Sequence, residues 1–185
     1  NQVEYGIYTN KDYGNVRGLE LKFDYSLNNL FVQTNYTYQY TKGNADNPSQ
    51  TFNRQGASID EVIRLIPMSW DQRHTFNLSV GYNTQNFGIT ATGYYNSGTP
   101  YTFSPQGESS LALLNLYPNN DYKPSNYHAD LSGYINLPKI FGVSPKIDFI
   151  VYNVLDRQNE YGVSSETGRA YTSVVNETEL LSHRS

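Results

Sequence analysis

The chain has 185 residues, and its 13 lysines and arginines against 17 aspartates and glutamates give a net charge of −4. No basic tract is present that would follow a phosphate backbone, so we expect no nucleic-acid partner. Cysteine is absent, which excludes disulfides and thiolate metal sites but leaves the compartment open.

Six strands are predicted, because apolar and polar residues alternate with a period of two along six segments. In chain order they cover residues 16–25, 30–40, 74–82, 87–96, 127–135 and 146–155. The first strand shows the pattern most clearly, with Leu19, Leu21 and Phe23 on one face and charged residues between them. Each strand therefore has one apolar and one polar face.

The connections between these strands alternate strictly between short and long. Short turns are expected at residues 26–29, 83–86 and 136–145, and long, proline-containing connections at 41–73 and 97–126. Within the first long connection, the segment SIDEVIRL (58–65) is predicted to form a short helix. Outer-membrane barrels have short periplasmic turns and longer outer loops, whereas soluble sandwiches mix the two lengths at both ends.

Aromatic residues and charges agree with a membrane setting. The 18 tyrosines and 8 phenylalanines favour boundaries between an apolar phase and water. Tyr25, Tyr82 and Phe87 border short turns, and Tyr38, Tyr40, Tyr95 and Tyr127 border long connections. Arg17, at a strand end, is the one full charge on the apolar faces of the first five strands. The low mean hydropathy of −0.63 does not exclude a barrel, because half of each strand faces a wet lumen.

We therefore predict an all-β fold, an antiparallel transmembrane β-barrel segment contributing about six or seven strands to a larger barrel. Two alternatives stay open at this point. One is a soluble β-rich binding module that recognises glycan or protein, and the other is a small eight-stranded outer-membrane barrel. The soluble module is expected to be monodisperse in water, whereas either kind of barrel is expected to aggregate without detergent.

Five segments resemble the C-terminal barrel half of TonB-dependent outer-membrane receptors, especially those of the Bacteroidetes type. They are YGNVRGLELKFDYSL, NYTYQYTKGN, PMSWDQRHTFNLSVGY, YYNSGTPYTF and VYNVLDRQN, in the order of that family. The resemblance implies a barrel of about 22 strands that is filled by an N-terminal plug domain. It also implies uptake of a scarce nutrient across the bacterial outer membrane, with energy relayed by TonB.

On this resemblance, residues 1–185 are the C-terminal portion of the barrel, and we expect the chain to be a fragment that lacks the plug. The implied partners are outer-membrane lipid, the rest of the barrel, the plug, TonB through the missing N-terminal part, and a surface lipoprotein over the mouth. The transported ligand stays open among siderophore, cobalamin, glycan and peptide, and no ligand-binding residue is assigned.

The sequence suggests no catalytic, cofactor or metal site, and we expect no enzyme and no cofactor. Asp71, Arg73 and His74 in WDQRH are interpreted as anchors of a loop–strand junction through hydrogen bonds and an ion pair, because no nucleophile lies beside them. His74 and His128 are expected on opposite faces and two strands apart, roughly 10 Å, which disfavours a shared metal. An outer-membrane hydrolase is disfavoured for the same lack of a nucleophile–base pair.

Two further groups are interpreted structurally. Glu20, Lys22 and Asp24 share the polar face of the first strand, where they are expected to be solvated or paired rather than to contact ligand or plug. Gly98 and Pro100 in SGTPY are expected to turn the chain away from the fourth strand.

Overall fold

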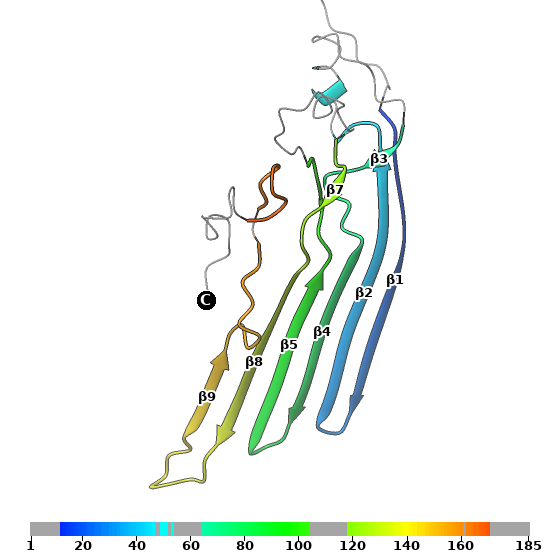
Figure 1. Ribbon diagram of the computed structural model, residues 1–185. Coiled ribbons are helices and arrows are strands. Elements are labelled where there is room, and N and C mark those ends of the chain that lie inside the picture. Colours follow the sequence, from blue (N-terminus) through cyan, green and yellow to red (C-terminus); the bar gives the residue numbers. More distant parts are fainter. Residues whose placement is uncertain are drawn as a thin grey trace, which may run out of the picture.

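The computed structural model describes residues 12–46, 49–51, 53, 64–103, 118–160 and 162–170. In this part of the chain, six long strands form one antiparallel sheet in which each strand pairs with the next along the path β1-β2-β4-β5-β8-β9 (Figure 1). Their bounds are Gly14–Leu27 for β1, Leu30–Gly43 for β2, His74–Asn83 for β4, Phe87–Asn96 for β5, Asn126–Asn136 for β8 and Lys146–Val151 for β9. The predicted all-β, antiparallel architecture is confirmed.

Three two-residue strands lie in the long connections. The strand β3 (Ile66–Pro67) pairs with the end of β2, and β6 (Pro100–Tyr101) pairs with β7 (Asp121–Tyr122) at the base of the second connection. The sequence analysis did not predict these strands, because two residues are too few to show a period.

The predicted alternation of connections is confirmed. The turns β1–β2, β4–β5 and β8–β9 lie at one end of the sheet, and the connections β2–β4 and β5–β8 lie at the other (Figure 1). At the β1–β2 turn, Asn28 has a left-handed backbone with φ of 51°, a conformation that asparagine tolerates better than most residues. We call the end with the long connections the rim.

The sixth strand is shorter than the sequence indicated. It ends at Val151 rather than at residue 155, because Asn153 has φ of 51° and leaves the extended conformation. The Asn153 backbone N–H donates to Oδ1 of Asp130 at 2.8 Å, and the next N–H, of Val154, donates to the carbonyl of Ala129 at 2.8 Å. The chain therefore remains hydrogen-bonded to β8, but it is no longer a regular strand.

Only two residues of the helix predicted in SIDEVIRL are described. Residues 58–63 lie outside the described residues, and Arg64 and Leu65, which are described, are not helical. Among the described residues there is no helix with the length and apolar character of a membrane span.

The register aligns the strand faces across the whole sheet. Residues paired across antiparallel strands project from the same face. One row across all six strands consists of Tyr25, Val32, Val80, Ala91, Leu131 and Val151. A row on the opposite face consists of Lys22, Asn35, Asn77, Tyr94 and His128. The sheet thus has one continuous apolar face and one continuous polar face.

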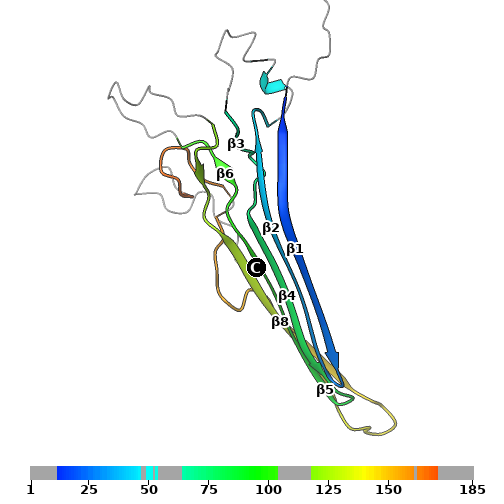
Figure 2. The same ribbon diagram turned by 90° about the vertical axis from the view of Figure 1, so that its right-hand side faces the viewer.

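The sheet is a single layer without a core of its own (Figure 2). On its apolar face, Leu19, Phe23 and Ile147 are 56%, 55% and 51% exposed. The buried apolar residues of the described part are Ala45, Ile66, Met68 and Ala170, all outside the six long strands. Within the described residues, β1 and β9 are open edges, so the sheet does not close on itself.

Candidate functional site: the polar face and the rim

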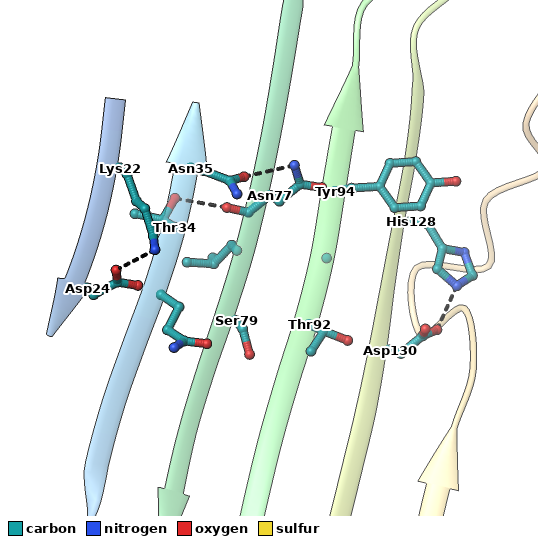
Figure 3. A pocket seen from close by; sticks show the side chains of 13 residues that line it. Lys22, Asp24, Thr34, Asn35, Asn77, Ser79, Thr92, Tyr94, His128 and Asp130 are labelled. Carbon is teal, nitrogen blue, oxygen red and sulfur yellow. Dashed lines mark hydrogen bonds and ion pairs between the residues drawn. The ribbon is translucent and has the colours of Figure 1, made fainter. Parts of the chain in front are cut away.

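The polar face of the sheet forms an open groove of about 490 Å³ (Figure 3). Side chains from five strands line it: Lys22 and Asp24 of β1, Gln33 and Asn35 of β2, Asn77 and Ser79 of β4, Thr92 and Tyr94 of β5, and His128 and Asp130 of β8. Polar and apolar residues alternate regularly along the strands, so the groove is lined by the residues that the sequence places on the polar face of each strand.

Most ionisable groups in the groove pair with a neighbour two residues away on the same strand. Lys22 Nζ lies 3.0 Å from Asp24 Oδ2, and both side chains remain largely exposed, at 70% and 47%. His128 Nε2 lies 2.6 Å from Asp130 Oδ1. For Lys22 and Asp24, the predicted pairing on a solvated face is confirmed, and Glu20 lies on the same face by register.

The two histidines lie on opposite faces, as predicted. His74 lies on the apolar face, where its Nδ1 is 2.8 Å from the hydroxyl of Tyr36, whereas the ring of His128 stacks on Tyr94 on the polar face. Strand β5 separates their two strands. Among the described residues, no three histidine, aspartate or glutamate side chains form a group that could hold a metal ion.

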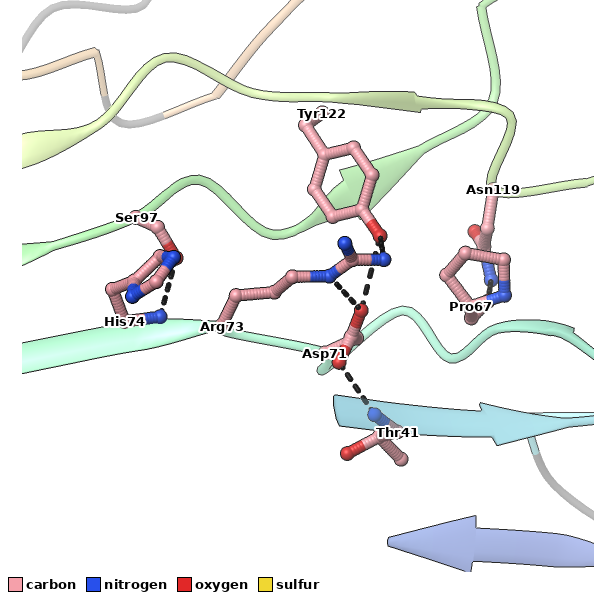
Figure 4. Close-up of polar contacts among 8 residues, drawn as sticks. All are labelled: Thr41, Pro67, Asp71, Arg73, His74, Ser97, Asn119 and Tyr122. Carbon is pink, nitrogen blue, oxygen red and sulfur yellow. Dashed lines mark hydrogen bonds and ion pairs between the residues drawn. The ribbon is translucent and has the colours of Figure 1, made fainter. Parts of the chain in front are cut away.

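At the rim, Asp71 is fully buried and ties together three parts of the chain (Figure 4). Its Oδ1 accepts the backbone N–H of Thr41 at 2.6 Å, and its Oδ2 accepts the hydroxyl of Tyr122 at 3.0 Å and Nε of Arg73 at 3.2 Å. We call Thr41, Asp71, Arg73 and Tyr122 the rim cluster. It joins β2, the segment before β4, and β7.

The position of Asp71 follows from the lengths of the strands. Because β4 begins at His74, opposite Tyr38, the last residues of β2 extend beyond it. The backbone ladder continues with the Gln39 N–H donating to the Arg73 carbonyl at 3.0 Å and resumes where β3 pairs with β2. Between these points the Asp71 carboxylate accepts the N–H of Thr41, so a side chain replaces a strand carbonyl.

Arg73 is held on several sides. Its Nη2 donates to the Tyr122 hydroxyl at 2.7 Å, and its guanidinium lies over the rings of Tyr40 and Tyr122, at 4.6 and 5.1 Å from their centroids. Burial lowers the pKa of Arg73, but the hydrogen bond to Asp71 and the electrostatic interactions with Tyr122, Asp71 and Tyr40 together outweigh this effect and raise the pKa above its ordinary value. Arg73 is therefore a permanent cation.

Two rim tyrosines have phenol groups with a raised pKa. Burial, together with the hydrogen bond and charge of Asp71, raises the pKa of Tyr122 to about 12. Burial and the charge of Asp121, which accepts a hydrogen bond from Tyr101 at 3.2 Å, raise the pKa of Tyr101 to about 12. Both phenols are neutral at physiological pH and act as hydrogen-bonding groups rather than as acids or bases.

The interpretation of Asp71, Arg73 and His74 as junction anchors agrees with this geometry. Besides the Asp71–Arg73 ion pair, the His74 N–H donates to Oγ of Ser97 at 2.9 Å, which joins the end of the first long connection to the start of the second. The sequence analysis missed Tyr122, which lies 51 residues from Asp71 along the chain. No local pattern marks a contact of that separation.

A second set of contacts joins the two long connections. Nδ2 of the buried Asn119 donates to Asp46 Oδ2 at 3.1 Å and to the Pro67 carbonyl at 3.0 Å. At Gly98 the chain passes so close to Lys123 that an added Cβ would lie 1.6 Å from the Lys123 carbonyl oxygen. The prediction that Gly98 and Pro100 turn the chain away from β5 is not confirmed, because Pro100 pairs with Tyr122 in the same register in which Asn96 pairs with Asn126. Close backbone approach is the reason for the glycine at position 98.

Between these contacts lies a cleft of about 350 Å³, which we call the rim cleft. It is lined by Lys42, Arg64, Leu65, Ile66, Pro67, Arg73, Asn119, Asn120 and Tyr122. Three of these residues are cationic, and none of the described lining residues is acidic.

In comparisons with known proteins, no family model, no curated protein and no solved structure matches the chain.

Proposed function

We propose that this chain is part of the β-barrel of an outer-membrane receptor that takes up a scarce nutrient in a TonB-dependent way. The observation that carries the proposal is the continuous, exposed apolar face opposite a continuous polar face. Apolar patches this extended are rare on soluble monomers, because they promote association in water. A bilayer covers such a face, while the polar face lines a wet lumen.

The dimensions of the sheet support the membrane setting. The strands β4, β5 and β8 have 10, 10 and 11 residues, which matches the roughly 9–11 residues of a tilted transmembrane strand. The strands β1 and β2 have 14 residues each and extend beyond β4 at the rim, as strands that run into outer loops do.

Exposed rings lie at both ends of the apolar face. Tyr25, Tyr82 and Phe87, near the short turns, are 42%, 42% and 47% exposed, and Tyr38 and Tyr95, toward the rim, are 39% and 40% exposed. Aromatic rings at these two levels are typical of the girdles at the two membrane interfaces. The open edges β1 and β9 would pair with further strands of the complete barrel, because lipid cannot satisfy backbone polar groups.

The receptor part of the proposal rests on the resemblance of the five segments to TonB-dependent receptors. In this reading, the outer loops and the plug capture the ligand, and the polar face lines the path that opens when the plug moves. The chain contributes no catalysis, and the described polar groups at the rim serve to hold the loops in place. Outer-membrane lipid, the plug, TonB and a surface lipoprotein are the proposed partners.

Localisation and transport can be tested in the native organism. The protein is expected in the outer-membrane fraction, soluble only with detergent, and with a migration on electrophoresis that changes on boiling, as for folded barrels. Deleting the TonB gene is expected to abolish nutrient uptake that depends on this protein. A monodisperse protein in aqueous buffer would instead favour the soluble β-rich binding module.

A further inference from the structure

We propose that the β8–β9 turn inserts the side chain of Phe141 into the interface of a phospholipid bilayer. Phe141 is fully exposed, and its neighbours at the tip of the turn, Ile140 and Val143, are more than half exposed. The turn extends beyond the ends of the other two short turns in both Figure 1 and Figure 2. The inference rests on the proposed membrane setting, which it extends from the sheet to this turn.

The tip of this turn has a defined backbone. The Ile140 N–H donates to the Val143 carbonyl at 2.9 Å, and the Val143 N–H donates to the Ile140 carbonyl at 3.0 Å. Between them, Phe141 and Gly142 have φ of 48° and 85°, which is the backbone of a two-residue type I′ hairpin loop. A loop that is fixed in advance loses little conformational entropy when its side chains bind.

Phenylalanine is an unusual residue for the first position of such a loop. Both positions need a left-handed backbone, which favours asparagine, aspartate and glycine. Gly142 meets this requirement, whereas Phe141 adopts the left-handed backbone at a steric cost. The β1–β2 and β4–β5 turns instead have polar tips, formed by Asn28 and Asn29 and by residues 84–86 (TQN). The formation of a turn therefore does not account for the exposed phenylalanine.

The apolar face of the sheet runs into this turn. On β8 the apolar face includes Leu131 and Ile135, and Leu137 follows with the same two-residue spacing. The Leu137 N–H donates to the Pro145 carbonyl at 2.9 Å, so the pairing of the two chain segments continues beyond Asn136, the last residue of β8. Lipid that covers the apolar face thus meets apolar residues up to the base of the exposed tip.

The charge of the turn fits a phospholipid interface. Lys139 is the one ionisable residue between Asn136 and Lys146, and it forms no ion pair among the described residues. Lys146 is offset by Asp148 at 2.6 Å. The turn therefore carries one positive charge beside an apolar tip, which is the combination that binds acyl chains beneath anionic headgroups. The long side chain of a lysine can reach the headgroup phosphates from such a position.

The test is tryptophan fluorescence of the complete native protein in vesicles of phosphatidylethanolamine and phosphatidylglycerol. Trp70, the one tryptophan of the chain, is removed by Trp70→Phe, and a probe is introduced by Phe141→Trp. The probe is expected to emit at short wavelength and to be quenched by lipids that carry bromine on the acyl chains near the headgroup. Gln85→Trp in the same background is the matched control at the polar tip of the β4–β5 turn. It is expected to emit as tryptophan does in water and to escape quenching.

A third probe, Ile89→Trp, separates this inference from the proposed function, because Ile89 lies on the apolar face between Tyr82 and Gly133. Quenching at positions 89 and 141 but not at 85 supports insertion of the turn. Quenching at 89 without quenching at 141 overturns the inference, leaves the barrel standing and favours a protein pocket as the occupant of the tip. Absence of quenching at both positions overturns the inference together with the membrane setting. Quenching at 141 alone supports insertion of the tip but overturns a spanning sheet.

Discussion

Asp71 and Thr41 meet at the rim through a hydrogen bond of 2.6 Å, in which the carboxylate accepts the backbone N–H of Thr41. Thr41 is 1% exposed and Asp71 is fully buried, so water cannot replace either partner. The same carboxylate accepts hydrogen bonds from Arg73 and Tyr122. A single side chain therefore completes the β-ladder and connects both long connections to the sheet.

The substitution Asp71→Ala is expected to destabilise the protein by about 3 kcal/mol, because it leaves a buried N–H without an acceptor and Arg73 without its counter-ion. The measurement is the free energy of unfolding by chemical denaturant in detergent. Asp148→Ala is the control, because Asp148 forms an ion pair with Lys146 at 2.6 Å but is 60% exposed. Its effect is expected to stay below about 1 kcal/mol, and equal losses in both variants would contradict the role of Asp71.

The alkaline pH dependence of stability tests the environment of Tyr122. The pKa of this phenol rises from 10.0 to about 12 on folding, first because of burial and then because of Asp71. The folded protein holds the proton more tightly than the unfolded chain, so this stabilisation is complete below pH 10.0 and is lost as the pH rises toward 12. We expect the free energy of unfolding to fall across that interval.

The substitution Tyr122→Phe is expected to flatten this decline, because the variant has no phenol proton to lose. Tyr101→Phe is expected to act in the same direction, since the pKa of Tyr101 is also raised to about 12. The measurement is denaturant unfolding at a series of alkaline pH values. An unchanged slope in both variants would show that neither phenol is held as the structure indicates.

Asn119 offers a test of the tie between the two long connections. It has a left-handed backbone with φ of 58°, and its amide donates to Asp46 and to the Pro67 carbonyl. Asn119→Asp keeps the size and tolerates this backbone, but it replaces the donor with a second carboxylate beside Asp46. We expect faster limited proteolysis within the long connections and a local destabilisation of about 1–3 kcal/mol.

The control for this prediction is Asn136→Asp in the sheet end opposite the rim. Asn136 also donates through Nδ2 to a backbone carbonyl, that of Gln85 at 2.6 Å, but it is exposed and has no carboxylate partner among the described residues. Proteolysis of the long connections is expected to stay unchanged in this variant. Equal acceleration in both variants would indicate a general effect of added charge rather than the loss of the Asn119 tie.

The long strands were predictable because their information is local. The alternation around Leu21 and Lys22, for example, repeats along β1 and needs no knowledge of its neighbours. The end of β9 was not predictable in this way, because Asn153 leaves the extended conformation where Asp130 of β8 accepts its N–H. The same holds for β3, β6 and β7, whose pairing depends on contacts across the long connections.

In the candidate site, too, local pairs were predictable from the sequence, whereas contacts between distant segments were not. Lys22 and Asp24 were assigned to the polar face from their spacing alone, and Asp71 and Arg73 were recognised as a local ion pair. Tyr122 was missed, because it lies 51 residues from Asp71 and the two meet only in the folded chain. The rim cleft is likewise invisible in the sequence, since its cations come from three separate segments.

The proposed membrane setting can be tested with two adjacent residues of β5. Ala91 and Thr92 are both exposed, but the register puts Ala91 on the apolar face, between Val80 and Leu131, and Thr92 on the polar face, between Ser79 and Asp130. If lipid covers the apolar face, Ala91→Arg is expected to cost about 2–4 kcal/mol near the midplane, whereas Thr92→Arg faces the wet lumen and costs little. The readout is the yield of folded protein in the outer-membrane fraction and its denaturant stability in lipid vesicles. A soluble sheet with both faces in water tolerates both arginines, because neither exposed position then carries a desolvation penalty. Equal tolerance of the two arginines would therefore remove the apolar face as support for a barrel.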